Sequence, residues 1–180
     1  LLERLSTNPD RNVEKIPGLR PAFNKDGRVT AATSSSISDG AAALVLMRES
    51  DCAKRGAKPL ARIVAQASNA HEPEWFTTAP VGAIRKVLDK AGWKPGDVDL
   101  YEINEAFAIV TMAALKDLGL DAAKVNVNGG AVALGHPIGA TGARILTTLI
   151  YALKARGLKK GVAALCIGGG EATAVALEIL

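Results

Sequence analysis

Cysteine, histidine and aromatic residues are scarce in this sequence of 180 residues, which has two cysteines, two histidines and 4% aromatic residues. Two cysteines without paired spacing argue against a disulfide framework or a zinc site, and they fit a reducing compartment. No uninterrupted apolar run is long enough to cross a bilayer. We therefore expect neither a membrane-spanning segment nor a bound metal ion.

Charge of either sign is also modest, because 22 basic and 18 acidic residues are spread along the chain. The basic residues form no dense stripe and few aromatic residues accompany them, so a nucleic acid is a poor candidate partner. The sequence begins with Leu1 rather than methionine, which we interpret as an internal start. We expect a cytoplasmic protein, and an organellar location stays open because a targeting peptide would be absent.

The first half of the chain divides into an irregular segment and a short apolar one. Residues 1–27 are dense in proline and glycine breakers, which predicts an extended, irregular path. Residues 29–39 are small and hydroxyl-rich, residues 41–47 are apolar and predict a buried strand, and residues 49–55 predict a helical turn. The length of the chain predicts one domain plus a fragment of another.

A regular alternation of apolar patterns begins after Pro59. Strand patterns cover residues 60–67, 98–102, 125–128, 162–167 and 173–179, and helical patterns cover residues 80–91, 105–118 and 139–156. Gly92 and Gly119 provide the expected stops of the first two helices. Strands that alternate with helices predict an α/β fold in which helices cover both faces of a mixed sheet.

His136 stands out because five glycines surround it, at positions 129, 130, 135, 139 and 142. A lone histidine is commonly a core or capping residue, but here a helix that begins near Gly139 would direct its amino-terminal dipole at the histidine loop. No Gly-Lys-Ser/Thr follows and Gly-x-Gly-x-x-Gly is absent from this run, which argues against a phosphate loop or a dinucleotide fingerprint. The pattern predicts an imidazole presented where negative charge is stabilised.

Cys166 ends an apolar strand pattern and precedes the glycines at positions 168–170. It could simply be a small buried hydrophobic residue, but a cysteine beside glycine amides can also touch a substrate as a thiol or thiolate. Cys52 lies in a charged helical turn, and we interpret it as incidental. Asn104, in Asn104-Glu-Ala-Phe107, follows a strand pattern and could either cap the next helix or take part in a site.

These three motifs, in this order, resemble the carboxyl-terminal half of the thiolase family, from about Pro17 to the end of the chain. The resemblance implies a thiolase-like layered α/β fold. It implies that residues 57–180 form the carboxyl-terminal domain, that residues 28–56 are the last helix and strand of the amino-terminal domain, and that residues 1–27 end an inserted loop region.

The resemblance also implies a role for each residue of the site. His136 would activate an acyl-accepting cysteine and later hold the thioester oxygen of an enolate. Cys166 would be the acid/base that protonates departing coenzyme A and removes an α-proton. Asn104 would orient a water in an oxyanion hole, and the backbone of Gly168 would donate to the acyl-enzyme oxygen.

Five further residues would line the substrate by the same resemblance. Ala31, Ser35, Ala106 and Phe107 fall where the pantetheine arm of coenzyme A is usually lined, and Phe76 falls near the acyl pocket. Phe76 could instead only pack its loop against the following helix.

The implied activity is the reversible, coenzyme A-dependent condensation of two acetyl-CoA to acetoacetyl-CoA and coenzyme A. Coenzyme A thioesters would be substrates, and no cofactor would be bound permanently. The nucleophilic cysteine would lie in an amino-terminal half outside this sequence, and dimers or tetramers are expected. Two rivals stay open: a non-catalytic module that binds acyl-CoA or lipid or serves as a scaffold subunit, and a condensing enzyme that uses acyl-carrier protein.

Overall fold

A four-stranded mixed sheet forms the centre of the computed structural model, which describes residues 13–180. The strands are β1 (Ala61–Ala70), β2 (Leu100–Ile103), β3 (Lys160–Cys166) and β4 (Glu171–Ile179), in the spatial order β1-β4-β3-β2. Strand β4 is antiparallel to both β1 and β3, whereas β3 and β2 are parallel. The predicted mixed sheet is confirmed.

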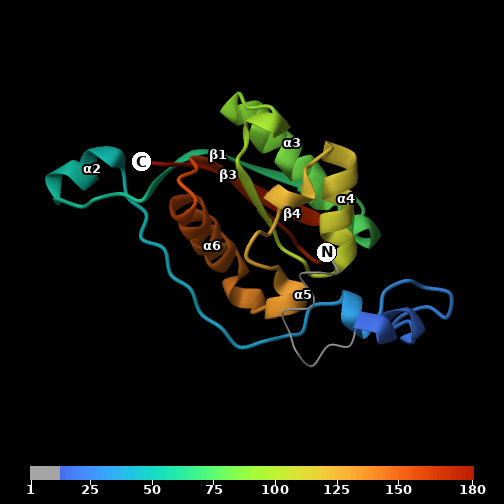
Figure 1. Ribbon diagram of the computed structural model, residues 1–180. Coiled ribbons are helices and arrows are strands. Elements are labelled where there is room, and N and C mark those ends of the chain that lie inside the picture. Colours follow the sequence, from blue (N-terminus) through green and yellow to red (C-terminus); the bar gives the residue numbers. More distant parts are fainter. Residues whose placement is uncertain (1–12) are drawn as a thin grey trace.

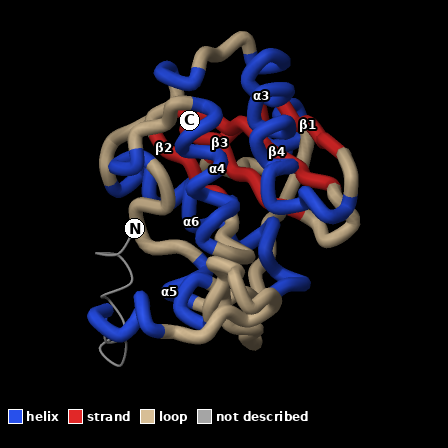
Figure 2. The backbone as a smooth tube through the Cα atoms, turned by 90° about the vertical axis from the view of Figure 1, so that its right-hand side faces the viewer, coloured by secondary structure: helices blue, strands red, loops and turns tan. Residues whose placement is uncertain are grey.

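Helices cover both faces of this sheet, as predicted (Figure 1). Helices α3 (Ala79–Ala91) and α4 (Ala108–Leu118) pack on one face, and α6 (Thr141–Ala155) packs on the other. The three helices end close to the predicted positions, and Gly92 and Gly119 cap the first two. In the view turned by 90°, the loops gather on the side of the molecule near α5 (Ala131–Leu134) (Figure 2).

Small residues on the sheet allow the helices to approach closely. Ala172, Ala174 and Ala176 of β4 are buried beneath α3, in the alternating pattern of a strand. On the other face, a side chain at Gly161 of β3 would meet Leu149 and Leu153 of α6 at 2.8–3.0 Å. The two buried layers account for the near-continuous apolar character of β3.

The remaining elements are short. They are α2 (Glu49–Lys54) and six 3-10 turns: Val13–Gly18, Ala31–Thr33, Pro73–Thr78, Pro95–Asp97, Ala122–Lys124 and Ile138–Ala140. Helix α2 confirms the predicted helical turn, whereas the turn Pro73–Thr78 was not predicted. The breaker pair Asn8-Pro9 of the predicted irregular segment lies outside the described residues.

The predicted strand over residues 41–47 is wrong in this structure. The segment is extended and passes α6 on its outer side before it reaches α2 (Figure 1). Val45 and Leu46 are 87% and 70% exposed. A strand requires a hydrogen-bonded neighbour, and no strand of residues 13–180 pairs with this segment. The region 28–56 therefore holds α2 and no strand.

The predicted strand over residues 125–128 is also wrong, because only one parallel bridge forms, between Tyr101 and Val125. The backbone turns at the next residue, Asn126, which has a positive φ of 48°.

No helix within residues 13–180 has both the length and the apolar character to cross a membrane.

Candidate active site

The ends of the two parallel strands bring Asn104 and Cys166 to one edge of the sheet. Asn104 directly follows β2, and its backbone N–H donates to the carbonyl of Ala164 in β3, at 2.9 Å. Cys166 is the last residue of β3, two positions further on. The carboxyl ends of neighbouring parallel strands are a common location for ligand sites in α/β sheets.

The ring of His136 lies between two side chains of this region. Its Nε2 is 3.5 Å from the Asn104 amide nitrogen, and its Nδ1 is 3.1 Å from the hydroxyl of Thr141 at the start of α6. The imidazole is half-buried, and burial lowers its pKa below the ordinary value, with a further contribution from the Arg144 guanidinium. The ring is therefore neutral near pH 7.

A serine-rich segment, residues 34–38, forms hydrogen bonds with the loops that carry Asn104 and His136. The hydroxyl and backbone N–H of Ser35 donate to the carbonyl of Ala106 at 2.9 and 3.1 Å. The backbone N–H of His136 donates to the carbonyl of Ser36 at 2.8 Å, and Ser38 donates to the carbonyl of His136 at 3.4 Å. The hydroxyl-rich stretch thus positions the histidine by backbone pairing.

Asn126 and Glu105 form a buried hydrogen-bond network beneath the site, called the clasp below, that was not predicted. The Asn126 side chain bonds the backbone N–H and carbonyl of Ile103, at 2.8 and 2.9 Å, and its amide donates to Glu105 at 3.2 Å. The other Glu105 oxygen accepts from the backbone N–H of Val132, at 3.2 Å. A side chain at Gly130 would collide with the Glu105 carboxylate, so glycine is required there. The available sequence signal was a charged residue, Glu105, close after an expected strand.

Replacing Asn126 with alanine should lower the free energy of unfolding of the chain by roughly 2–4 kcal/mol, because several buried partners lose their hydrogen bonds. Urea denaturation of the 180-residue chain measures the change. Asn128→Ala is the matched control, since Asn128 lies in the same loop but is exposed, and its side-chain oxygen accepts a hydrogen bond from Arg156. Equal loss in the two variants would contradict the clasp.

Cys166 is half-buried, and burial raises the pKa of its thiol although a backbone hydrogen bond opposes the rise. The thiol is therefore protonated near neutral pH. Gly168 lies in the turn between β3 and β4, and a side chain built there would meet nothing within 4 Å. Space for a ligand thus adjoins the Gly168 backbone. The other cysteine, Cys52, is buried on α2.

Phe107 contacts two other phenylalanines beside the serine-rich segment. The Phe107 ring lies edge-on to Phe76 at 6.2 Å and to Phe23 at 6.0 Å between ring centroids. Ser34 forms a bridge with Phe107. Ala31 is exposed in the preceding 3-10 turn. The structure therefore brings together Ser35, Ala106, Phe107 and Phe76.

Two charged residues near the site, Glu102 and Arg144, were also not predicted from the sequence. Arg144 of α6 lies with one guanidinium nitrogen 3.7 Å from the carboxylate of Glu102 in β2, and with the other 3.4 Å from the side-chain oxygen of Asn104. Glu102 is 2% exposed. A glutamate inside the strand Leu100–Ile103, which is buried throughout, was the available signal.

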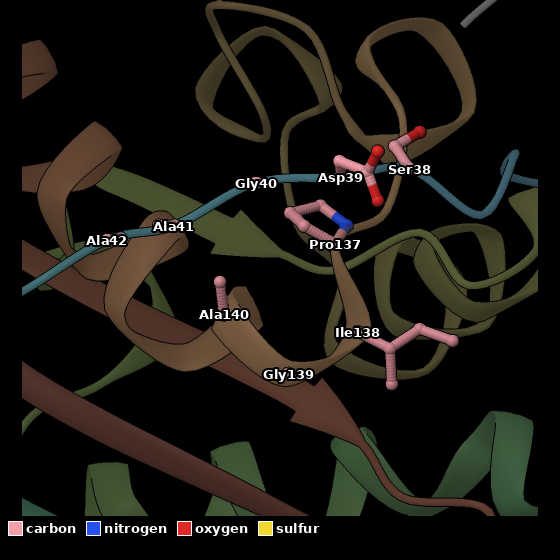
Figure 3. A pocket seen from close by; sticks show the side chains of 9 residues that line it. All are labelled: Ser38, Asp39, Gly40, Ala41, Ala42, Pro137, Ile138, Gly139 and Ala140. Carbon is pink, nitrogen blue, oxygen red and sulfur yellow. The ribbon is translucent and has the colours of Figure 1, made fainter.

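A hollow of about 380 Å³ lies next to the histidine loop, between residues 38–42 and 137–140 (Figure 3). Gly40 packs so closely on Pro137 that a side chain there would meet the proline ring at 2.8 Å. The hollow is open to solvent and holds no group of metal ligands. Within residues 13–180, no cluster of three histidine, cysteine or acidic side chains is placed to bind a metal ion.

Comparisons with known proteins give two family matches and several close relatives. Residues 57–179 match the family model of the thiolase C-terminal domain, and residues 6–50 match that of the thiolase N-terminal domain. Over 165 residues the chain is 54% identical to the acetyl-CoA acetyltransferase of Allochromatium vinosum, covering 92% of this chain and 42% of that protein. Over 167 residues it is 53% identical to a probable acetyl-CoA acetyltransferase of Dictyostelium discoideum, covering 93% and 40%.

Solved structures of related proteins have a similar fold. The Bacillus anthracis acetyl-CoA acetyltransferase is similar with a TM-score of 0.92 and 53% identity, over 95% of this chain and 43% of that one. A human mitochondrial 3-ketoacyl-CoA thiolase in complex with CoA is similar with a TM-score of 0.88 and 40% identity, over 96% and 44%. The chain thus spans less than half the length of these relatives. With a family match over residues 57–179 and this agreement in fold, the chain belongs to the thiolase family.

Proposed function

We propose that this chain is the carboxyl-terminal part of a thiolase that interconverts two acetyl-CoA with acetoacetyl-CoA and coenzyme A. The observation that carries the proposal is the contact of Asn104 with His136 at the sheet edge where Cys166 ends β3. The relatives named acetyl-CoA acetyltransferase, at 54% identity, support this substrate over other acyl-CoA thioesters.

In this proposal His136 acts first as a base. Its Nε2 takes the proton of a nucleophilic cysteine, whose sulfur attacks the thioester carbonyl and displaces coenzyme A as a thiolate. Cys166, protonated near pH 7 because burial raises its pKa, gives its proton to that thiolate. Covalent transfer of the acetyl group is then complete.

The same two residues serve the second half-reaction. The Cys166 thiolate removes an α-proton from the second acetyl-CoA, while His136, now protonated at Nε2, donates to the thioester oxygen as the enolate forms. The enolate carbon attacks the acetyl-enzyme and expels the cysteine as a thiolate, which takes its proton back from His136 Nε2. Asn104 and the Gly168 backbone would supply further donors to developing oxyanions.

The nucleophilic cysteine and the remaining fold would come from an amino-terminal part of the same enzyme. The apolar, exposed segment 41–47 supports this partner, because an unpaired extended segment offers backbone groups for another strand. No permanently bound cofactor is proposed. A homodimer or homotetramer in the cytoplasm completes the proposal.

The test is turnover by a fusion, in which the chain is joined to the remaining part of the Allochromatium vinosum relative. This fusion should thiolyse acetoacetyl-CoA with coenzyme A, measured as loss of acetoacetyl-CoA and gain of acetyl-CoA. A non-catalytic module that binds acyl-CoA or lipid would instead retain the ligand without turnover. A fusion that is folded and binds acetoacetyl-CoA but leaves it intact would reject the proposal.

Phe76 should restrict the acyl chain length. Its rigid ring packs against Phe107 and leaves less adaptable space than a flexible side chain. In the fusion, kcat/KM should fall from C4 to C6 to C10 3-ketoacyl-CoA, since each excluded methylene matters by roughly 1–3 kcal/mol. Phe76→Ala should narrow the C4-to-C6 difference by about tenfold.

Trp75→Ala is the matched control, because Trp75 is the neighbouring aromatic residue and is 58% exposed. It should leave the chain-length profile as it was. An unchanged profile in Phe76→Ala would show that Phe76 only packs its loop, and better use of C10 by the unmodified fusion would reject the short-chain preference.

A further inference from the structure

A chain of polar contacts runs from Arg144 through Asn104 and His136 to the first turn of α6. Arg144 Nη2 lies 3.4 Å from Asn104 Oδ1, Asn104 Nδ2 lies 3.5 Å from His136 Nε2, and His136 Nδ1 lies 3.1 Å from Thr141 Oγ1. The Thr141 hydroxyl in turn lies 3.1 Å from the carbonyl oxygen of Ile138. Asn104 and Thr141 are buried, Arg144 and His136 are half-buried, and Ile138 is exposed.

The guanidinium end of this series of contacts sets one direction of hydrogen bonding, and the threonine end is compatible with it. A guanidinium can only donate, so Arg144 requires the oxygen of the Asn104 amide to face it. The amide NH2 must then face His136 and donate to Nε2, which is therefore the unprotonated ring nitrogen. At the other end the Thr141 hydroxyl has two backbone carbonyls to donate to, those of Pro137 and Ile138, and can accept a bond from the protonated Nδ1.

We propose that Arg144 is a positioning residue that selects the Nδ1-protonated tautomer of His136 through the orientation of the Asn104 amide. The inference rests on the proposed function for its importance, since a base that takes a thiol proton at Nε2 must keep Nε2 free of hydrogen. Arg144 itself touches no reacting atom. It acts through Asn104.

Glu102 holds the guanidinium in place. Its carboxylate lies 3.7 Å from Arg144 Nη1, which is a Coulombic rather than a hydrogen-bonded distance, and it lies on β2, two residues before Asn104. The charged pair and the amide are therefore supported by one strand and one helix, both fixed by the core. Elements of this kind position functional groups more accurately than loops do.

Without Arg144 the direction of hydrogen bonding along these polar contacts is no longer imposed. The Asn104 amide can then rotate so that its oxygen accepts from a proton on Nε2, and the Thr141 hydroxyl can donate to Nδ1 instead. The opposite tautomer, which unconstrained imidazole prefers, should become the major form. The ratio of the two tautomers should change by at least about fivefold, the scale of one net hydrogen bond.

Nuclear magnetic resonance of the ring nitrogens tests this on the 180-residue chain without any catalysis. Long-range proton–nitrogen spectra of the 15N-labelled chain, recorded about two pH units above the ordinary imidazole pKa, distinguish a protonated from an unprotonated nitrogen. The chain has two histidines, and His71 provides an internal reference. Its Nε2 lies 2.8 Å from the carbonyl oxygen of Trp75, so this nitrogen must carry the proton.

The unmodified chain should therefore show opposite tautomers for its two histidines. Arg144→Met removes the donor and should shift His136 toward the Nε2-protonated form, whereas Arg144→Lys, which keeps a donor, should shift it less. Arg156→Met is the matched control, since Arg156 also donates to an asparagine side-chain oxygen, that of Asn128, at 3.1 Å. It should leave both rings unchanged.

Two results would overturn the inference: an Nε2 proton on His136 in the unmodified chain, or an unchanged tautomer ratio in Arg144→Met with the His71 signals in place. Should Arg144→Met fail to fold, the spectrum of the unmodified chain and that of Arg144→Lys still decide. The proposed function can fail separately. An inactive fusion combined with the Nδ1-protonated His136 would reject the thiolase reaction and leave the role of Arg144 intact.

Discussion

Replacing His136 with alanine in the fusion is expected to lower kcat for thiolysis by at least about 10²-fold, the scale on which positioned acid–base groups and oxyanion donors act. The variant loses the base that takes the thiol proton and the donor to the enolate oxygen. Steady-state rates with saturating acetoacetyl-CoA and coenzyme A measure the effect. His71→Ala is the control, because His71 contacts the backbone of its own loop, and it should keep the activity.

Cys166→Ser should cost at least about 10²-fold as well, because a hydroxyl is too weak an acid and its conjugate base too scarce for either proton transfer. The double variant should lose less than the product of the two single losses, since both residues serve one transition state. Near-normal rates in either single variant would show that packing residues had been mistaken for catalytic ones.

Local patterns sufficed to predict most of the sheet and its helices. The apolar periodicity of residues 80–91 and 139–156 predicted α3 and α6, and Gly92 and Gly119 located the ends of two helices. Such signals succeed because the helix faces and strand ends are set by residues close in sequence. Asn104 and Cys166 could be placed at strand ends for the same reason.

Residues 41–47 show where this reasoning failed. Their composition suits a buried strand, but whether a strand forms depends on a neighbour elsewhere in the chain or outside it. Here the segment is extended with Val45 and Leu46 exposed. The strand prediction for residues 125–128 failed for a local reason. The side chain of Asn126 forms hydrogen bonds with the backbone N–H and carbonyl of Ile103, and the backbone of Asn126 turns away with a positive φ.

The contacts among the supporting residues of the site could not be predicted from the sequence. Glu102 lies on β2, and Thr141 and Arg144 lie on α6. These two elements meet only because the helix packs on the sheet next to the site. Their spacing in sequence carries no signal for that contact. The motif around His136 could be recognised, whereas the tautomer of its ring depends on a residue eight positions away.

The isolated chain should have no thiolase turnover, because the account places the nucleophile outside it. The chain has only two cysteines. In the proposed mechanism Cys166 serves proton transfer, and Cys52 is buried on α2, a six-residue helix that carries no histidine. Covalent catalysis requires a thiol within reach of an activating base, and neither residue fulfils that role.

Thiolysis of acetoacetyl-CoA by the isolated 180-residue chain and by the fusion, compared at equal concentration, tests the central claim most directly. The fusion should turn over acetoacetyl-CoA and the isolated chain should not, and Cys52→Ser should leave the activity of the fusion unaffected. Clear turnover by the isolated chain that is lost in Cys52→Ser would contradict the claim, because the nucleophile would then lie within this sequence.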